Sequence, residues 1–248
     1  MIINVARKEL KSMFSSPMGW VILAIAQFIL GTYFTLSFNQ YFEIISLRGS
    51  LTENMGLTQF ICEGVFETAS ILFLFMIPLV SMRVISDEFK SQTMSFLISA
   101  PISIKEIILG KFLALVTYHS LLIISMLLMT MTLSLWVELD FGLIFANAIG
   151  LWLLMCAISA MGLFFSSQTQ YAVIAGFLTF LTTAFLVLVE KFYPENTQTI
   201  FTNISIMNHY RNFANGLMQN VDVIYFTLFA TFFVLMAMNR LHVLRISE

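Results

Sequence analysis

The stretch Phe141–Val189, FGLIFANAIGLWLLMCAISAMGLFFSSQTQYAVIAGFLTFLTTAFLVLV, contains no charged residue over 49 positions. As a single helix it would be on the order of 73 Å long at about 1.5 Å per residue, whereas the hydrocarbon core of a bilayer is about 30 Å thick. The stretch must therefore turn, and the polar residues SSQTQ at 166–170 mark the turn. It predicts two membrane-spanning helices, at about 141–165 and 171–190.

The composition of the whole chain also indicates a membrane protein. Of the 248 residues, 59% are hydrophobic and 10% are charged, whereas globular domains carry about 25% charged residues. The net charge of −2 gives no basis for nucleic-acid binding. Cys62 and Cys156 form no CxxC pair and are expected at different depths, so we expect neither a disulfide nor a metal site.

Four further apolar runs predict spans at about 18–38, 67–85, 108–137 and 222–240. The second run is bounded by Glu67 and Arg83. A charge at the bilayer centre costs roughly 2.5–3.5 kcal/mol on insertion scales, so these two residues are expected near opposite interfaces. The predicted fold class is an all-α polytopic membrane protein with six transmembrane helices, forming one transmembrane domain over residues 1–248.

Residues 2–15 precede the first span and have a different pattern. Their apolar residues fall at helical spacing on one face, at Ile3, Ala6, Leu10, Met13 and Phe14. This pattern predicts an amphipathic helix that lies on the membrane surface. Since the apolar run that follows is too long for the h-region of a secretory signal, we do not expect a cleaved signal peptide.

The distribution of lysine and arginine predicts the orientation. With the N-terminus inside, the cytoplasmic segments hold Arg7, Lys8, Lys11, Arg83, Lys90, Lys105, Lys111, Arg240 and Arg245. The outer segments hold Arg48, Lys191 and Arg211. This nine-to-three excess predicts that both termini are cytoplasmic. In the second outer loop, five residues at helical spacing predict a short helix dipping into the outer interface: Ile206, Tyr210, Phe213, Ala214 and Leu217.

The cytoplasmic segment 87–105, between spans two and three, is patterned. Apolar residues and Thr93 follow a helical stripe that predicts a helix over 89–100. Pro101 ends this helix, because the residue before a proline is disfavoured in the α region. Ser103 and Glu106 form a capping box that begins a new helix running into the third span. The segment is either an ordinary surface loop on the headgroups or a lever that contacts a cytoplasmic protein, and its length, cap and corner favour the lever.

Three stretches of the chain resemble the permease subunits of type-2 (exporter-class) ABC transporters, particularly the gliding-motility-like subgroup. They are ARKELKSMFSSPMGWVILA (6–24), DEFKSQTMSFLISAPISIKEIILGKFLA (87–114) and HYRNFANGLMQNVDVIYFTLFATFFVLMAMNRL (209–241). With the six-span layout, the resemblance extends over nearly the whole chain. The sequence departs from the family pattern at Gln92, where a glycine is usual, and at Ser95, where a glutamate is frequent.

The resemblance implies a bacterial inner-membrane permease that works with a separate P-loop ATPase and with a second permease copy or a homologous permease. The chain has no G-x-x-x-x-G-K-[ST] motif, so we expect the partner to bind ATP and Mg²⁺. An auxiliary envelope protein is a further expected partner. The implied ATPase-coupling interface comprises Asp87, Glu88, Phe89, Lys90, Gln92, Thr93, Phe96, Leu97, Pro101, Ser103 and Lys105. Secondary cytoplasmic contacts are expected at Arg7, Lys8, Lys11, Ser167 and Gln168.

Two other functions remain open: a non-transporting scaffold of an envelope machine on the same fold, and a solute-binding membrane subunit or secondary transporter. The last would need polar groups at mid-membrane, of which the sequence has few. We expect His119 to be hydrogen-bonded within the bundle and the methionines to serve packing. Small residues four apart are expected to allow close helix packing, at Ala146 and Gly150, Gly162 and Ser166, and Ala172 and Gly176.

Overall fold

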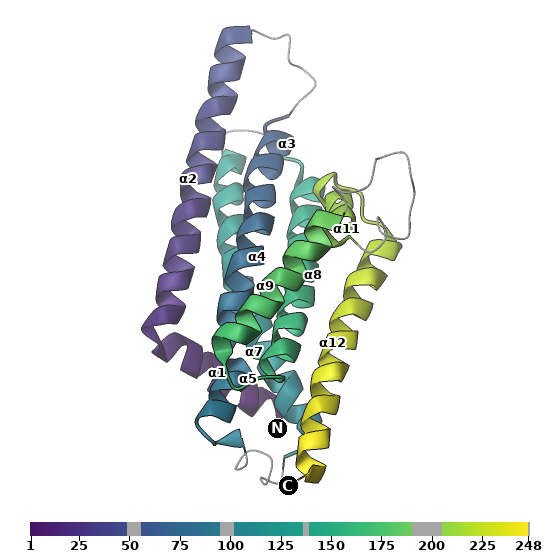
Figure 1. Ribbon diagram of the computed structural model, residues 1–248. Coiled ribbons are helices and arrows are strands. Elements are labelled where there is room, and N and C mark those ends of the chain that lie inside the picture. The colour runs from purple at the N-terminus through teal and green to yellow at the C-terminus, as the bar shows by residue number, and fades with distance from the viewer. Residues whose placement is uncertain (49–55, 95–101, 136–138, 190–204, 248) are drawn as a thin grey trace.

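The computed structural model describes residues 1–48, 56–94, 102–135, 139–189 and 205–247, and every regular element in these ranges is helical. Long helices run side by side, and both termini lie at the same end of the bundle (Figure 1). In chain order the elements are α1 (Ile2–Ser15), α2 (Pro17–Arg48), α3 (Leu57–Ile61), the π-turn η2 (Cys62–Phe66), α4 (Glu67–Ser81), α5 (Arg83–Lys90), α7 (Ile104–Thr132), the 3₁₀ turn η3 (Leu133–Leu135), α8 (Phe141–Ser166), α9 (Ala172–Leu188), α11 (Ile206–Ala214) and α12 (Asn220–Ser247).

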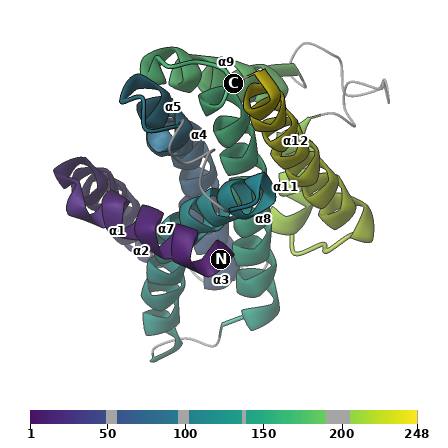
Figure 2. The ribbon, with the colours of Figure 1, turned by 90° about the horizontal axis from the view of Figure 1, so that it is seen from below.

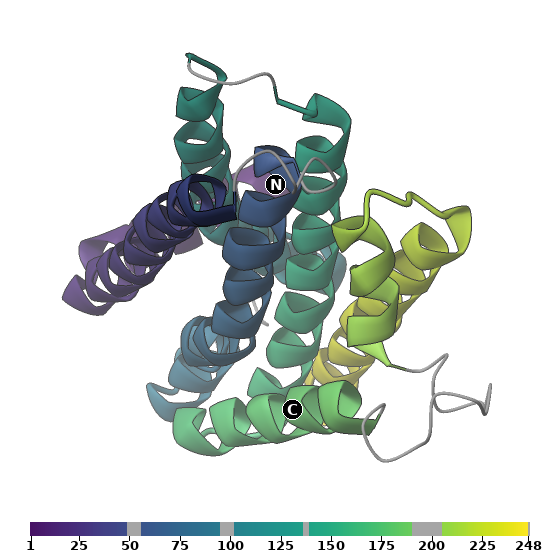
Figure 3. The same cartoon turned by 90° about the horizontal axis from the view of Figure 1, so that it is seen from above.

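Five helical stretches in the described residues are long and apolar enough to cross a membrane: 17–43, 58–90, 104–135, 141–166 and 220–245. They correspond to five of the six predicted spans, and the all-helical, polytopic prediction is confirmed. The remaining predicted span, 171–190, is the 17-residue helix α9, which is about 25 Å long at 1.5 Å per residue. The path of α9 is oblique to the long helices: it rises diagonally in Figure 1 and extends sideways when the bundle is seen from above (Figure 3).

The second span differs from its prediction at both ends. Instead of beginning at Glu67, the helix begins at Leu57 and passes through the π-turn η2 before it becomes α4. It also continues beyond the predicted end at residue 85, because α5 follows α4 after the single turn residue Met82 and ends at Lys90. An apolar run alone does not reveal these ends, since both extensions carry polar residues and are held by neighbouring helices.

Helix α8 forms the centre of the bundle and contacts α4, α7, α9, α11 and α12. The predicted small residues allow these contacts within the chain. A Cβ at Gly150 would lie 2.5 Å from Phe213 Cβ of α11, and one at Gly176 would lie 2.8 Å from the Met82 sulfur. A Cβ at Gly162 would collide with the Ser81 side chain of α4. Close packing of neighbouring helices therefore needs glycine at all three positions.

The predicted outer helix is present as α11, and most of its apolar face is buried in the protein. Ile206, Tyr210 and Phe213 are almost fully buried, and the Tyr210 hydroxyl donates a hydrogen bond of 3.1 Å to the Phe66 carbonyl. Leu217, beyond the end of the helix, is 56% exposed. The face predicted to dip into the lipid interface thus covers α8 and the π-turn instead.

Candidate functional site

The candidate site lies at the end of the bundle that carries both termini, where α1 crosses beneath the long helices and contacts α7 (Figure 2). Three segments far apart in the sequence meet here: the surface helix α1, the short helix α5 and the first turns of α7. The coupling segment predicted from the sequence begins in α5 and ends in α7. The arrangement therefore brings the predicted surface helix against both described ends of that segment.

The start of α7 is fixed by the capping box that the sequence predicts. The Ser103 hydroxyl accepts a hydrogen bond of 3.2 Å from the Glu106 amide, and Glu106 Oε2 accepts one of 3.0 Å from the Ser103 amide. These bonds satisfy two backbone donors that a helix start leaves unpaired. Since the register of α7 is set at Ser103, the position of Lys111 two turns later is set as well.

Lys111 is the centre of a buried ion cluster. Its ammonium lies 3.0 Å from Glu9 Oε1 of α1 and 2.8 Å from Glu88 Oε1 of α5, and it donates a 2.8 Å hydrogen bond to the Val84 carbonyl. The Lys111 side chain is 1% exposed, compared with 11% for Glu9 and 16% for Glu88. Lys8 lies 3.8 Å from both carboxylates, so the cluster holds two cations and two anions.

Gly110 permits the close approach that this cluster requires. A Cβ at Gly110 would lie 2.6 Å from Val5 Cβ of α1, a contact too short for any larger residue without movement of the helices. The glycine therefore lets α1 lie directly on α7, and the adjacent Lys111 then reaches Glu9 one turn farther along α1. The Gly110–Lys111 pair, which carries part of the family resemblance, thus attaches the surface helix to the bundle.

The junction between α4 and α5 is held by one hydroxyl of α8. Ser166 Oγ donates a 2.9 Å hydrogen bond to the Met82 carbonyl and accepts 3.0 Å hydrogen bonds from the Ile85 and Ser86 amides. The Ser86 hydroxyl in turn donates a 3.0 Å hydrogen bond to the Ser166 carbonyl. All of these groups are buried. Because backbone groups at a helix junction lack intrahelical partners, Ser166 both satisfies them and fixes the direction of α5.

The prediction of a helix over residues 89–100 is wrong at the start of that range. Helix α5 ends at Lys90, and Gln92 adopts φ +57°, the left-handed conformation that commonly ends a helix. The apolar stripe predicted one continuous helix, but the stripe carried no information about the backbone at Gln92. This is the position where the family usually has glycine, which adopts such a conformation without strain. The departure at Gln92 therefore lies at a turn that glycine would favour.

The predicted interface residues fall into three groups in the structure. Asp87, Lys90, Gln92, Thr93, Ser103 and Lys105 are exposed, as are Arg7, Lys8 and Lys11 on α1 and Gln168. Glu88 points inward to Lys111, and Phe89 packs partly buried against the apolar cluster that contains Ile85 and Met94. Phe96, Leu97 and Pro101 lie outside the described residues.

The predicted cytoplasmic contact at Ser167 is corrected by the structure. Ser167 is 1% exposed, and its hydroxyl donates a 2.6 Å hydrogen bond to the Phe164 carbonyl. Its position in a polar turn indicated a surface residue, but packing of the turn encloses it. We therefore remove Ser167 from the proposed contact surface and keep Gln168, which is exposed.

Sequence reasoning missed Glu9, Lys111 and Ser166 as members of the site, although the first two carry a detectable signal. Glu9 lies three residues after Ala6 and four before Met13, so it interrupts the apolar face of the surface helix. Lys111 similarly shares a helical face with residues that are all buried, at Ile107, Ile108, Ala114 and Leu115. An ionisable residue on an apolar face needs a partner. One acidic and one basic residue that each lie on an apolar helix face are therefore expected to form an ion pair.

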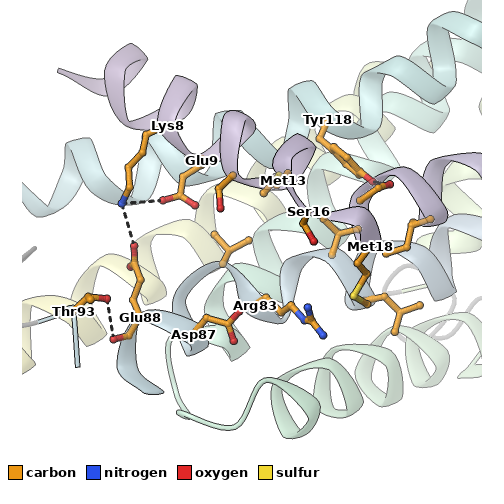
Figure 4. A pocket seen from close by; sticks show the side chains of 16 residues that line it. Lys8, Glu9, Met13, Ser16, Met18, Arg83, Asp87, Glu88, Thr93 and Tyr118 are labelled. Carbon is orange, nitrogen blue, oxygen red and sulfur yellow. Dashed lines mark hydrogen bonds and ion pairs between the residues drawn. The ribbon is translucent and has the colours of Figure 1, made fainter. Parts of the chain in front are cut away.

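A cavity of about 380 Å³ opens beside the ion cluster, between α1, the start of α2, the α4–α5 junction and α7 (Figure 4). Its polar side includes Lys8, Glu9, Arg83, Asp87 and Glu88. Its apolar side is lined by Met13, Met18, Ile22, Leu79, Val80 and Val84. The cavity is thus amphipathic, with the coupling segment at its polar end.

The chemistry of the site is that of charge pairing and packing. Among the described residues, no group of three or more His, Cys, Asp or Glu side chains could hold a metal ion. His119, predicted to be bonded within the bundle, is fully buried and its Nδ1 lies 2.8 Å from the Leu115 carbonyl. The arrangement can transmit the position of α5 to α1 and α7, because one buried lysine joins the three helices.

The fold and the site define a multi-pass membrane protein whose N-terminal helix is ion-paired to a segment between two spans. Residues 3–243 match the family described as ABC-2 family transporter protein. The chain therefore belongs to the ABC-2 transporter family, as a permease component of an ABC transporter. In this family ATP hydrolysis normally takes place in a partner component. A search of curated proteins found no match.

Proposed function

We propose that the chain is the permease of an ATP-driven exporter of the gliding-motility-like subgroup, in a bacterial inner membrane. Six segments cross the membrane, with α9 as a short and oblique fifth span, and both termini are cytoplasmic. A separate P-loop ATPase binds ATP and Mg²⁺, and two permeases, identical or homologous, form the translocation path between them. An auxiliary envelope protein completes the assembly. The family match supports the permease role, and the charge distribution supports the orientation.

The ATPase contacts the segment 87–105 at its exposed side chains, together with Phe96, Leu97 and Pro101. Within the described residues this surface comprises Asp87, Lys90, Gln92, Thr93, Ser103 and Lys105, flanked by Arg7, Lys8, Lys11 and Gln168. Closure of the ATPases on ATP moves this segment. Motion then passes along two routes: through α5 to α4, and through the Ser103 cap to α7.

One observation carries the coupling mechanism: Lys111 binds Glu88 of α5 and Glu9 of α1 at once. A displacement of α5 therefore cannot leave α1 and α7 in place without separating buried opposite charges. Such a separation costs about 3–5 kcal/mol when a buried pair loses a partner. The cluster makes the end of the second span, the surface helix and the third span move as one body.

Co-purification with the ATPase tests the proposed contact at the segment 87–105. We expect Phe96→Asp or Leu97→Asp to abolish co-purification of a P-loop ATPase with the tagged permease. Leu217→Asp is the matched control, because Leu217 is 56% exposed and lies after α11, on the face proposed to be outside. If the chain purifies as a stable assembly with no P-loop ATPase, or if all three variants lose the ATPase equally, the proposed contact is wrong.

Measurements of ATP turnover and of transport distinguish the ATP-driven transporter from the scaffold and from the secondary transporter. Glu88→Gln weakens the ion cluster while it leaves the exposed surface of the coupling segment unchanged, so we expect the ATPase to stay bound and ATP turnover by the complex to fall. Unchanged turnover would favour the non-transporting scaffold. Solute transport by the permease alone in liposomes without ATP would instead establish a secondary transporter.

A further inference from the structure

The amphipathic cavity beside the ion cluster has a polar end whose charges are not all matched. Glu9 and Glu88 are balanced by Lys111 and Lys8, at the distances given above. Arg83 and Asp87 remain. Both are exposed side chains of α5 that line the cavity, and neither forms an ion pair within the described residues. The cavity therefore presents one cation and one anion that lack partners.

These two residues belong to the same wall of the cavity. They are four positions apart on α5, so their side chains project from the same face of the helix, and Figure 4 shows both among the side chains that line the cavity. The facing wall adds the hydroxyls of Ser12 of α1 and of Ser16, the residue after α1, for which the described residues provide no hydrogen-bond acceptor. The polar end thus offers a guanidinium and two hydroxyl donors for an anion, and a carboxylate for a cation.

The opposite side of the cavity is apolar and borders two membrane helices. Met18 and Ile22 come from the first turns of α2, and Leu79 and Val80 come from the last turns of α4. Leu79 is 45% exposed, so the apolar wall is continuous with the surface that faces lipid. The volume of about 380 Å³ falls in the range of roughly 300–1,000 Å³ that small-molecule pockets have.

We propose that this cavity binds one phospholipid molecule of the adjacent leaflet whose headgroup carries both a phosphate and a primary ammonium, as in phosphatidylethanolamine. Arg83 and the hydroxyls of Ser12 and Ser16 bind the phosphate, and Asp87 accepts hydrogen bonds from the ammonium. The acyl chains leave the cavity along Ile22 and Leu79. The site requires only that the chain lies in a membrane, so it is independent of the proposed ATPase contact.

The charge pattern determines which lipids are selected. Phosphatidylglycerol has a phosphate but no ammonium, so it leaves Asp87 without a partner beside a second negative charge. Phosphatidylcholine has a cationic group that cannot donate an N–H hydrogen bond, so it keeps the charge attraction to Asp87 but loses the hydrogen bond. We therefore expect the order phosphatidylethanolamine, then phosphatidylcholine, then phosphatidylglycerol. A polybasic surface site would give the reverse preference, with the anionic lipid bound best.

The test uses the full chain, reconstituted in vesicles of equimolar phosphatidylethanolamine, phosphatidylcholine and phosphatidylglycerol, and then extracted in mild detergent. Native mass spectrometry measures the lipids that stay bound. We expect one phosphatidylethanolamine per chain, with occupancy reduced about tenfold or more by Arg83→Gln, since a hydrogen bond to a charged group contributes about 1.5–3 kcal/mol. Asp87→Asn should keep lipid bound but remove the preference for phosphatidylethanolamine over phosphatidylcholine.

Arg7→Gln is the matched control, because Arg7 is an exposed cation of α1 that does not line the cavity. Ser12→Trp provides a second variant, which fills the cavity from the α1 wall and should exclude every lipid. The proposal is overturned if Arg83→Gln and Arg7→Gln retain phosphatidylethanolamine equally. It is also overturned if the wild-type chain retains the three lipids in equal amounts, or phosphatidylglycerol above the others. Loss of lipid with the ATPase still bound would support the lipid site independently of the coupling contact.

Discussion

Replacement of Lys111 by methionine removes the centre of the ion cluster and leaves the shape of the side chain nearly unchanged. Glu9 and Glu88, whose side chains are 11% and 16% exposed, would then lie close together, and Lys8 would be the remaining cation of the described cluster. Removal of one partner from a buried ion pair costs about 3–5 kcal/mol. Since the two carboxylates retain some access to water, we expect the lower value, about 3 kcal/mol.

The expected loss is large enough for a thermal assay. For chains of 150–250 residues, 1 kcal/mol shifts the unfolding midpoint by about 2–4 °C. Lys111→Met should therefore lower the midpoint of the detergent-solubilised protein, followed by tryptophan fluorescence, by about 6–12 °C. Lys105→Met is the control on the same helix, because Lys105 is exposed in the first turn of α7. Its effect should be within about 1–2 °C, since surface substitutions usually change stability by no more than about 0.5 kcal/mol.

A triple variant separates charge from packing. Lys111→Met combined with Glu9→Gln and Glu88→Gln removes the two uncompensated carboxylates, and such neutral replacements of buried ion clusters are often close to neutral in stability. We expect the triple variant to recover most of the midpoint that the single variant loses. Two results would show that the cluster does not hold α1 and α5 to α7 by charge pairing. One is an unfolding midpoint of Lys111→Met equal to that of Lys105→Met, and the other is a midpoint of the triple variant as low as that of Lys111→Met.

Three further substitutions, one of them with a control, are measured in the same assay. Gly110→Ala forces α1 from α7, because its Cβ would lie 2.6 Å from Val5, and should cost about 1–3 kcal/mol; Gly31→Ala, with 3.8 Å to its nearest neighbour, should not destabilise. Ser166→Ala leaves buried backbone groups of the α4–α5 junction unpaired and should cost about 1–3 kcal/mol, and an unchanged midpoint would refute this role. Asp222→Asn weakens the buried 2.6 Å contact with His209 between α11 and α12; a loss of about 1.5–3 kcal/mol is expected, and a loss below about 0.5 kcal/mol would contradict it.

The sequence predicted the membrane class and most helix positions because these depend on local patterns. An uncharged run such as 141–189 can be stable only in lipid or in a protein core, and its single polar interruption fixed the turn between α8 and α9. The helix cap at Ser103 likewise depends only on the four residues 103–106, and the structure contains both of its hydrogen bonds. The amphipathic pattern of residues 2–15 gave α1 with the predicted bounds.

Local pattern failed where a neighbouring element determines the outcome. The stripe through Phe89 and Thr93 is helical in spacing, yet the helix ends at Lys90 because Gln92 takes a left-handed conformation. The apolar face of α11 was predicted to enter lipid, but most of it is covered by α8. An apolar helix face predicts only that the face is shielded from water. Whether lipid or another helix covers it depends on the tertiary packing.

By itself, the sequence determined that this chain is a helical membrane protein with a patterned polar segment between two of its spans. The tertiary structure alone decided what joins that segment to the rest of the molecule. Lys111 and Glu9 are 102 positions apart in the chain, and no spacing rule links them. They meet because Gly110 lets α1 lie against α7, and they stay together because a buried ammonium such as that of Lys111 is costly to leave without an opposite charge.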